Sequence, residues 1–426
     1  MKQKKLKASL VANGVIHLPG SKSITNRLLL MSALSDGETL IQNYLDSDDT
    51  SQMLNALKVL GVEFNIVDKT DILIKGCNHS FLNKNTKLSL GNAGTAFRPL
   101  TAVLAIMGGT YELSGVSRMH DRPIKDLVDA LIQIGAKIDY LGNQGYPPLK
   151  INPGNIKSNK NISIKGDVSS QYLTSLLIGG PLCNQDLEIK ITGDLISKPY
   201  IDITLRLLAQ FGIKYKNNKW GSFTLSSPSR FKSPKKIRVE GDASSASYFF
   251  AAGAIAGPVE VKNINKSSIQ GDLQFLEVIK KMGANIEYLS NSIKVSNQKQ
   301  LTGITIDCKN IPDAAMTLAI LALFAKGSTT LESIASWRIK ETDRISAMET
   351  ELKKLGASVT TTENSITIEP PNVINNNISI DTYDDHRMAM CFSLVCLANK
   401  NIVINDPECT NKTYPNFFKD FGGIIE

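Results

Sequence analysis

The sequence is poor in the residue types that build metal and disulfide sites. Only four histidines occur among 426 residues, and none of them has the spacing of a metal-ligand pair. The six cysteines form no Cys-x-x-Cys pair, and several lie in apolar runs, so we expect them to be reduced and mostly buried. These shortages argue against a secreted disulfide-rich domain and against a zinc site, and they favour a cytoplasmic protein.

Long apolar runs and aromatic clusters are also absent. The longest apolar runs, such as residues 316–325, are too short to span a bilayer, and the basic N-terminus is not followed by the apolar segment of a signal peptide. The net charge of +8 suggests anionic partners, although a solvated surface explains many of the lysines. Aromatic residues make up 6% of the chain and do not alternate with cations, so we expect neither a nucleic acid nor a membrane as partner.

The stretch LPGSKSITNR, residues 18–27, has the signals of a helix start: Pro-Gly, a serine-rich turn and then an apolar run. It is not a Walker A loop, because no Gly-Lys-Ser/Thr follows a glycine four residues upstream. Lys22 and Arg27 lie at this start, where a helix already carries free N–H groups and a partial positive charge. Cations are unfavourable there unless an anion binds, so the stretch is a candidate anion site, with an ordinary surface helix as the alternative.

An amphipathic helix that ends in glycine and precedes a strand recurs six times, about 70 residues apart. A left-handed helix C-cap explains the glycine of each copy. These glycines are Gly61, Gly135, Gly212, Gly283, Gly356 and Gly422. The repetition predicts six copies of one supersecondary unit, three in residues 21–239 and three in residues 240–426. The polar, Pro/Ser-rich residues 226–236 between them read as an exposed connection.

A second helix, apolar on nearly all sides, recurs once in each of the six units, and we expect it to be buried. Its copies begin near Ser23, Thr95, Gln171, Ser245, Asp313 and Arg387. N-capping accounts for about half of the polar residues in their first turns. It does not account for Lys22, Arg27, Arg98 or Arg387, because cations are disfavoured at helix N-termini. If the units pack alike, these N-termini form a face in each domain that suits a multiply charged anion.

Other polar residues allow both a structural and a functional interpretation. The spacing of charges in WRIKETDR, residues 337–344, favours a surface helix of ion pairs. The segment SRMHDRP, residues 117–123, is typical of a solvated loop or of a binding loop. Asp313 by default caps a helix, but near a bound phosphate its pKa could be tuned for proton transfer. His386 is explained more simply as a structural residue than as a general base.

Longer motifs recur in one order along the whole chain. They comprise residues 19–23 with Arg27, then residues 90–99, 122–123, 169–172, 197–200, 241–248, 311–316, 337–344 and 385–390, and finally Lys412. In these motifs the chain strongly resembles the 3-phosphoshikimate 1-carboxyvinyltransferases, or EPSP synthases, which are enolpyruvyl transferases.

The resemblance implies an α/β fold of two similar lobes, each built from three repeated β/α units with buried parallel helices and outer sheets, an inside-out α/β barrel. Residues 1–20 and 240–426 would form a discontinuous lobe with the catalytic carboxylates and the phosphoenolpyruvate-side residues. Residues 21–239 would form the second lobe, with most of the contacts to shikimate 3-phosphate.

The family reaction transfers the enolpyruvyl group of phosphoenolpyruvate to the 5-hydroxyl of shikimate 3-phosphate by addition and elimination. It releases phosphate and leads to chorismate and the aromatic amino acids. The resemblance implies no cofactor, no metal and no covalent enzyme intermediate. We expect a monomer whose partners are these two small anions, with glyphosate as an inhibitor that competes with phosphoenolpyruvate.

Site residues follow from the resemblance, motif by motif. The groups expected to bind shikimate 3-phosphate are Lys22, Ser23, Arg27, Ser169, Ser170, Gln171, Ser197, Asp313, Ser336 and Lys340. Those expected to bind phosphoenolpyruvate are Lys22, Gly94, Arg122, Gln171, Arg344, Arg387 and Lys412. Asp313, Glu341 and Lys22 are the catalytic candidates, and the two carboxylates are the candidates for proton transfer.

One departure from the family and two related activities bear on this interpretation. The family often has Asn before the Trp of WRIKETDR, where this chain has Ser336, which puts a direct contact of Ser336 with the shikimate phosphate in doubt. The nearest alternative is a UDP-N-acetylglucosamine enolpyruvyl transferase, which has a reactive Cys in the loop before its Arg-Pro; residues 114–121 contain none. An RNA-end enzyme of the same fold is less well supported, because no site for nucleotide attack is evident.

Overall fold

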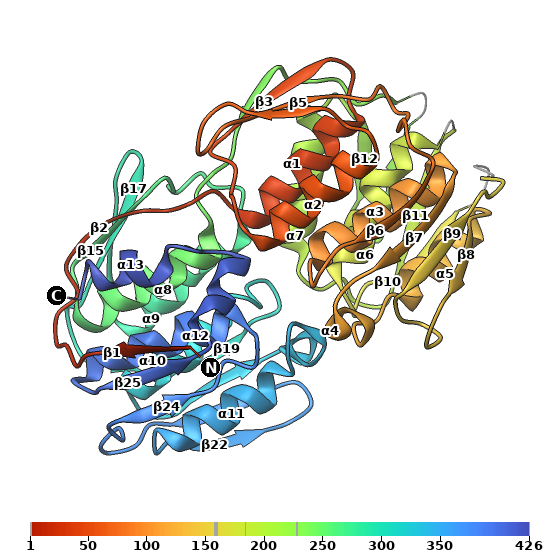
Figure 1. The fold of residues 1–426 in the computed structure, drawn as a ribbon. Helices are drawn as coiled ribbons and strands as arrows, with labels where there is room; N and C mark the ends of the chain where they lie inside the picture. Colours follow the sequence, from red (N-terminus) through yellow and green to blue (C-terminus); the bar gives the residue numbers. More distant parts are fainter. Residues whose placement is uncertain (1, 157–160, 184, 227–228, 426) are drawn as a thin grey trace. The chain divides into compact units, whose positions relative to one another are not determined.

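The computed structural model describes residues 2–156, 161–183, 185–226 and 229–425 of a mixed α/β protein with several small sheets (Figure 1). The chain divides into two compact units. The first unit is discontinuous and consists of Met1–Pro19 and Glu240–Glu426, and the second unit is Gly20–Val239. The expected division, after residue 20, lies one residue later than this one.

The second unit contains three four-stranded sheets with the same pattern. Two neighbouring strands are parallel, and the other two extend the sheet as antiparallel neighbours. The strand orders are β14(Lys236–Arg238)-β3(Glu38–Gln42)-β5(Ile72–Lys75)-β4(Phe64–Ile66), β6(Asn85–Ser89)-β7(Thr110–Ser114)-β9(Leu149–Asn152)-β8(Lys137–Tyr140) and β10(Ile162–Lys165)-β11(Leu187–Thr192)-β13(Ser222–Leu225)-β12(Tyr215–Asn218).

The first unit repeats this pattern in two sheets and shortens it in a third. The four-stranded sheets are β2(Gly14–His17)-β15(Val259–Lys262)-β17(Ser292–Ser296)-β16(Asn285–Tyr288) and β19(Thr305–Asp307)-β21(Thr329–Glu332)-β23(Ile366–Glu369)-β22(Ser358–Thr361). The smaller sheets are β24(Ile378–Ile380)-β25(Ile402–Asn405)-β1(Gln3–Leu6) and the pair β18(Leu301–Thr302)-β20(Ala325–Lys326).

The pairing of the N-terminal strands β1 and β2 with strands of Glu240–Glu426 explains why the first unit is discontinuous. Strand β2 precedes the first helix of the second unit in sequence, but it pairs in parallel with β15 of the first unit. Strand β14 precedes the first long helix of residues 240–426, but it pairs in parallel with β3 of the second unit. Strand β2 thus completes a sheet of Glu240–Glu426 from the far side of the second unit's segment, whereas β14 lies within the continuous segment of its own unit.

Six helices that bury most of their residues match the predicted apolar helices, and their starts lie within two residues of the expected ones. In the second unit they are α1(Lys22–Leu34), α3(Gly94–Met107) and α6(Ser170–Gly179), followed by η1(Gly180–Leu182). In the first unit they are α8(Ala243–Ala256), α10(Ala315–Leu321) with η3(Ala322–Phe324), and α12(His386–Ser393) with η5(Leu394–Ala398). They bury apolar side chains on all sides, so they build the core of each unit (Figure 1).

The six amphipathic helices are α2(Asp48–Val59), α5(Lys125–Gln133), α7(Lys198–Gln210), α9(Phe275–Met282), α11(Arg344–Lys354) and α13(Phe417–Gly422). The glycine that follows each of the first five has a positive φ, so the predicted left-handed caps are confirmed there. The sixth prediction is wrong, because Gly422 is the last residue of α13 and has no positive φ. Short helices complete the chain: α4(Ser117–His120), η2(Gly271–Gln274), η4(Ala335–Ile339) and η6(Pro407–Lys412).

The segment expected to connect two domains belongs to the second unit. Most of its described residues are exposed or half-buried, as predicted, but Phe231 is fully buried and Lys236 begins β14; Ser227 and Pro228 lie outside the described residues. The six cysteines are free and five of them are buried, as predicted. Among the described residues, no helix is both long enough and apolar enough to cross a membrane.

Candidate functional site

Hydrogen bonds join the first two turns of α1, α3, α6 and α7 in the second unit. The Asn26 side chain of α1 donates a hydrogen bond to Thr95 Oγ1 of α3 at 2.7 Å. Arg27 of α1 donates to Thr174 Oγ1 of α6 at 3.3 Å and to Thr204 Oγ1 of α7 at 2.8 Å. Polar side chains therefore connect the N-terminal turns of these helices.

Arg27 is buried among neutral acceptors. Besides the two threonine hydroxyls, its guanidinium donates to the carbonyl oxygens of Ser23 at 2.8 Å and Tyr200 at 3.3 Å. Among the residues that the structure describes, Arg27 forms no ion pair. Burial lowers the pKa of Arg27 to about 10, which still leaves it charged at neutral pH. A buried cation that is hydrogen-bonded but not neutralised favours the binding of an anion.

Arg122 is held in a similar way at the start of α3. Its Nη1 donates to the backbone oxygen of Asn92 at 3.0 Å and to the side-chain oxygen of Asn92 at 2.9 Å. A Cβ atom added to Gly94 would lie 3.0 Å from Arg122 Nη2, 3.1 Å from Gln171 Oε1 and 2.5 Å from Arg98 Nη1. The absence of a side chain at Gly94 therefore leaves room for these three polar groups at one helix end.

The other predicted residues of the second unit lie at helix starts. Lys22 and Ser23 begin α1, and Lys22 Nζ is 3.2 Å from a carboxylate oxygen of the buried Asp49. Ser169 is the N-cap of α6 and accepts a hydrogen bond from the Gln171 backbone at 3.3 Å, with Ser170 between them. Ser197 is the N-cap of α7 and adopts a left-handed conformation, with φ of 53°.

Arg344 is the centre of the charged network in the first unit. Its side chain is 1% exposed, and its guanidinium contacts three carboxylates: Asp385 at 2.8 Å, Glu341 at 2.9 Å and Asp313 at 3.0 Å. Burial alone would lower the pKa of Arg344, but these carboxylates outweigh that effect and raise it above its ordinary value. The network therefore keeps Arg344 fully charged in the protein interior.

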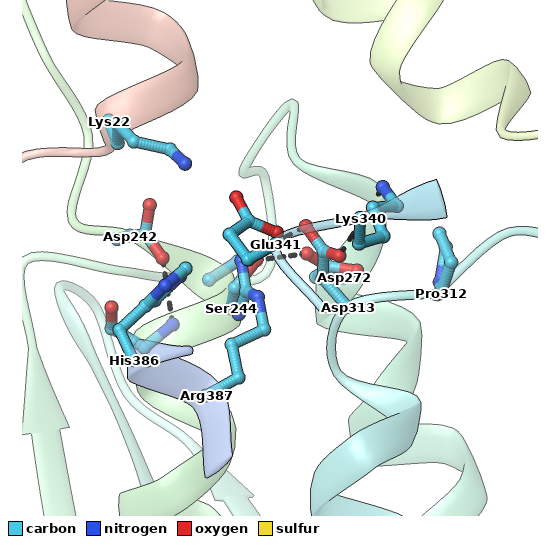
Figure 2. A network of polar contacts seen from close by, with 12 residues as sticks. Lys22, Asp242, Ser244, Asp272, Pro312, Asp313, Lys340, Glu341, His386 and Arg387 are labelled. Carbon is cyan, nitrogen blue, oxygen red and sulfur yellow. Dashed lines mark hydrogen bonds and ion pairs between the residues drawn. The ribbon is translucent and has the colours of Figure 1, made fainter. Parts of the chain in front are cut away.

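Asp313 lies between the cations of this network. One carboxylate oxygen contacts Arg344 at 3.0 Å and Lys340 at 3.7 Å, and the other contacts Arg387 at 3.0 Å. Figure 2 shows the side chains of Asp313, Glu341 and Lys340 grouped together. Burial would raise the pKa of Asp313, but Arg387, Lys340 and Arg344 together hold it well below its usual range. Burial lowers the pKa of Lys340, although Asp313 acts in the opposite direction.

The remaining predicted residues lie near this network in sequence or in the fold. Arg387 follows His386 at the start of α12 and also donates to the Tyr248 hydroxyl of α8 at 3.2 Å. Lys412 ends η6 and is buried. Ser336 is half-buried in η4, one residue before Trp337.

Two structural interpretations drawn from the sequence are wrong. Residues 337–344 are not a surface helix of ion pairs, because Arg344 is buried and α11 begins only at that residue. Asp313 does not cap α10, whose N-cap is Ala314; its carboxylate binds the arginines instead. Residues 117–123, for which the sequence allows a solvated or a binding loop, contain the short helix Ser117–His120 and the buried Arg122.

Side-chain capping is present in three of the six buried helices, so it accounts for fewer of the polar residues in their first turns than the predicted half. Ser169, Asp242 and Asp385 accept hydrogen bonds from backbone N–H groups of their first turns. The residues before α3 and α10 are alanines, and Ser21 before α1 makes no such bond. The first turns without side-chain caps are those that carry or adjoin Lys22, Gly94 and Asp313.

Sequence reasoning missed two residues that build this site. Asp385 lies in a recognised motif, but it is 41 residues away from Arg344 in sequence. No local sequence pattern therefore predicts their contact. Trp337 is fully buried, and its indole N–H donates to the carbonyl oxygen of Pro312 at 2.6 Å, just before Asp313. In the described part of the chain, no group of three histidine, cysteine, aspartate or glutamate side chains could hold a metal ion.

The fold and the two sets of buried cations thus define a mixed α/β protein that binds small polyanions. The family model for "EPSP synthase (3-phosphoshikimate 1-carboxyvinyltransferase)" matches residues 7–421. Curated 3-phosphoshikimate 1-carboxyvinyltransferases from Cupriavidus necator and Cellvibrio japonicus are 54% and 52% identical to the chain, with 97% and 99% of both sequences covered.

Solved structures agree with this match. An EPSP synthase from Acinetobacter baumannii superposes with a TM-score of 0.84 at 25% identity and covers 100% of this chain and 98% of its own. The enolpyruvyl transferase NikO from Streptomyces tendae has a TM-score of 0.78 at 13% identity, over 99% and 96% of the two chains, and shows the same fold. The chain belongs to the EPSP synthase family. It is an enzyme with 3-phosphoshikimate 1-carboxyvinyltransferase activity and acts in the shikimate pathway.

Proposed function

We propose that the chain transfers the carboxyvinyl group of phosphoenolpyruvate to the 5-hydroxyl of shikimate 3-phosphate with binding groups from each unit. Both substrates carry a phosphate and a carboxylate. The observation that carries the proposal is the set of arginines that each unit buries near helix N-termini: Arg27, Arg98 and Arg122 in the second unit, and Arg344 and Arg387 in the first. Buried guanidinium groups form strong, charge-assisted hydrogen bonds with phosphates and carboxylates.

The second unit would supply most of the contacts to shikimate 3-phosphate. We assign these to Lys22, Ser23, Arg27, Ser169, Ser170, Gln171 and Ser197. Gly94 and Arg122 would bind phosphoenolpyruvate, and Lys22 and Gln171 would contact both substrates. The support is the set of hydrogen bonds that connects the first two turns of α1, α3, α6 and α7 around Arg27.

The first unit would supply the catalytic carboxylates. We assign Arg344, Arg387 and Lys412 to phosphoenolpyruvate, and Asp313, Ser336 and Lys340 to shikimate 3-phosphate. Ser336 is the weakest assignment in this set, because a serine reaches less far than the asparagine that the family often has.

The reaction needs proton transfers at two atoms. In the addition step, the 5-hydroxyl oxygen bonds to C2 of phosphoenolpyruvate, the hydroxyl loses its proton, and C3 gains one. In the elimination step, C3 loses a proton, the bond between C2 and the phosphate oxygen breaks, and phosphate leaves. We assign the proton transfers to Asp313 and Glu341, with Lys22 as the third catalytic group, and the surrounding cations would stabilise the charge that develops.

Substrate binding itself would make Asp313 a better base. In the free protein, Arg387, Lys340 and Arg344 hold the pKa of Asp313 low, so its carboxylate is ionised but weakly basic. Anions bound to these cations would reduce the positive potential at Asp313 and raise its pKa. The carboxylate would then accept the hydroxyl proton only when both substrates are present.

We also propose that each unit is an inside-out α/β barrel of three repeated β/α units with parallel buried helices and outer sheets. The common strand order of five sheets supports this. Competition of glyphosate with phosphoenolpyruvate is a further proposal. The monomeric state, the cytoplasmic location and the absence of any cofactor or metal stay predictions.

The test is phosphate release from phosphoenolpyruvate with shikimate 3-phosphate or UDP-N-acetylglucosamine as acceptor. We expect release with the first acceptor only. Release with the second acceptor only would overturn the proposed acceptor. A folded protein that is inactive with both would overturn the proposed catalytic roles.

A further inference from the structure

The segment that leads into α12 contains an unusual turn. Between β24 and α12, Tyr383 and Asp384 both have a φ of 55°, and the Asp385 N–H donates to the Thr382 carbonyl oxygen at 2.9 Å. Two successive positive φ values at the centre of such a turn are the pattern of type I′, which normally uses Gly, Asn or Asp. A bulky residue such as Tyr383 is rarely found in this conformation, so another contact must hold the turn.

That contact is made by the Tyr383 hydroxyl, which donates to Glu351 Oε1 of α11 at 2.7 Å. The Glu351 side chain is 0% exposed, and its Oε2 accepts from the Asp381 backbone N–H at 3.2 Å and pairs with Lys354 at 2.8 Å. Burial and the nearby Glu351 raise the pKa of Tyr383 to about 12, so the hydroxyl keeps its proton at neutral pH. Glu351 thus binds the turn segment through both of its oxygens.

Helix α11 holds this segment at two points. Glu351 follows Arg344 by seven residues, which places both on one face of the helix, two turns apart. Arg344 binds the Asp385 carboxylate after the turn, while Glu351 binds Asp381 and Tyr383 before and within it. The position of Asp385 relative to α11 is therefore fixed from both sides of the strained turn.

Asp385 in turn positions the arginines of the network. Its carboxylate accepts from the Arg387 backbone N–H at 2.9 Å and from Arg344 Nε at 2.8 Å, and Arg387 reaches Asp313 at 3.0 Å. We propose that the hydrogen bond from Tyr383 to Glu351 positions Arg387 and Arg344 for phosphoenolpyruvate. The inference rests on the proposed assignment of both arginines to that substrate. Displacements of about 1 Å at such groups are enough to reduce catalysis.

Tyr383→Phe tests the proposal because it removes only the hydroxyl. We expect the KM for phosphoenolpyruvate to rise about 3- to 10-fold, as for the loss of one hydrogen bond. The KM for shikimate 3-phosphate should rise less, within about twofold, since most of the residues assigned to that substrate lie in the other unit. An unchanged KM for phosphoenolpyruvate, or an equal rise in both KM values, would overturn the proposal.

Tyr288→Phe is the matched control. Tyr288 donates to Glu277 at 3.3 Å in the same unit and is 36% exposed, compared with 40% for Tyr383, but it contacts no residue of the network. We expect this variant to leave both KM values unchanged. The thermal unfolding midpoints of both variants should be measured, so that a general loss of stability is recognised.

A second variant separates positioning from other effects. Glu351→Gln keeps the shape of the side chain, and the double variant with Tyr383→Phe should raise the KM for phosphoenolpyruvate by less than the product of the single effects, because both act through one bond. Fully multiplicative effects would contradict the proposal. Arg387→Lys tests the underlying assignment. If this variant leaves the KM for phosphoenolpyruvate unchanged, the proposed role of Arg387 fails. If Arg387→Lys raises this KM but Tyr383→Phe does not, only the positioning role of Tyr383 is refuted.

Discussion

The two units bury guanidinium groups at helix starts but stabilise them in opposite ways. Arg27 in the second unit is surrounded by two threonine hydroxyls and two backbone carbonyl oxygens. Arg344 in the first unit is surrounded by three carboxylates. Burial lowers the pKa of Arg27 to about 10, whereas the carboxylates around Arg344 outweigh its burial and raise its pKa.

The two environments suit the buried arginines to different functions. Neutral ligands hold a cation in place without cancelling its charge, so the region around Arg27 keeps a positive potential for a phosphate. Carboxylates cancel much of the charge of Arg344 and Arg387, but they also provide groups that exchange protons. Under the proposed function, the second unit therefore serves binding, and the first combines binding with acid–base chemistry.

The largest effect is expected at Asp313, which distinguishes the two regions most clearly. Asp313→Asn keeps the shape and removes the proton acceptor, so kcat should fall about 10³-fold, in the range measured for general acid–base groups. Phosphate release in steady state measures this. Asp307→Asn, which removes an exposed ion pair with Lys309 in the same unit, should leave kcat unchanged. A fall of less than about threefold at Asp313 would contradict its assignment.

Replacement of each buried arginine by methionine compares the two environments directly. Arg344→Met leaves Asp385 and Glu341 buried without their cation and should reduce the free energy of unfolding by about 3–5 kcal/mol. Arg27→Met leaves only neutral groups and should change it by about 1 kcal/mol or less, while the affinity for shikimate 3-phosphate falls about 100-fold.

Urea unfolding and calorimetric titration of the two variants measure these quantities. Equal losses of stability would show that the neutral ligands and the carboxylates compensate the buried charge equally, which would remove the contrast between the units.

A smaller effect is expected at Gly94, where the second unit has three polar groups near one α-carbon. The added methyl of Gly94→Ala would lie within 3.1 Å of Arg98, Arg122 and Gln171, so these flexible side chains must move. Inhibition by glyphosate should weaken about tenfold, the usual effect of one extra methyl in a fitted pocket. Inhibition assays at fixed phosphoenolpyruvate measure this.

Gly422→Ala is a matched control, because nothing lies within 4 Å of the added Cβ and the backbone is not left-handed. It should leave inhibition unchanged. Equal inhibition of the wild-type protein and Gly94→Ala would refute the role of Gly94.

The smallest effect is expected at Trp337, which supports Asp313 in the first unit. Trp337→Phe keeps an aromatic ring but removes the N–H that binds the Pro312 carbonyl oxygen. The kcat should fall about 3- to 10-fold, as expected for one hydrogen bond that orients a catalytic group. The other tryptophan, Trp220 in the second unit, provides the control, and Trp220→Phe should leave kcat unchanged. A similar loss at both positions would contradict a specific role.

Local sequence signals predicted much of the fold. Apolar periodicity located the six buried helices, since a helix buried on all sides needs apolar residues on all sides. Glycines located five left-handed caps, since a residue without a Cβ adopts that conformation at little cost. The sixth, Gly422, is the last residue of α13 and has no positive φ, so a glycine near a helix end does not by itself mark a left-handed cap.

The burial of charged residues was not predictable in the same way. Residues 337–344 have the spacing of a surface helix, and the exposure of Arg344 depends on partners 31 and 41 residues away, Asp313 and Asp385. Spacing along a helix reports only which side chains share a face. Whether that face meets water or another helix is decided by how the units fold.

The sequence by itself determined the repeats, the buried helices and the polar character of their first turns, because these follow from periodicity and backbone conformation over a few residues. Its motifs also carried the resemblance to the EPSP synthase family, which the comparisons confirm. Only the tertiary structure decided that Asp313 binds two arginines, that Arg27 has neutral partners, and that Tyr383 anchors a strained turn. These are contacts between segments distant in the chain, and their energies depend on burial, which no local pattern fixes.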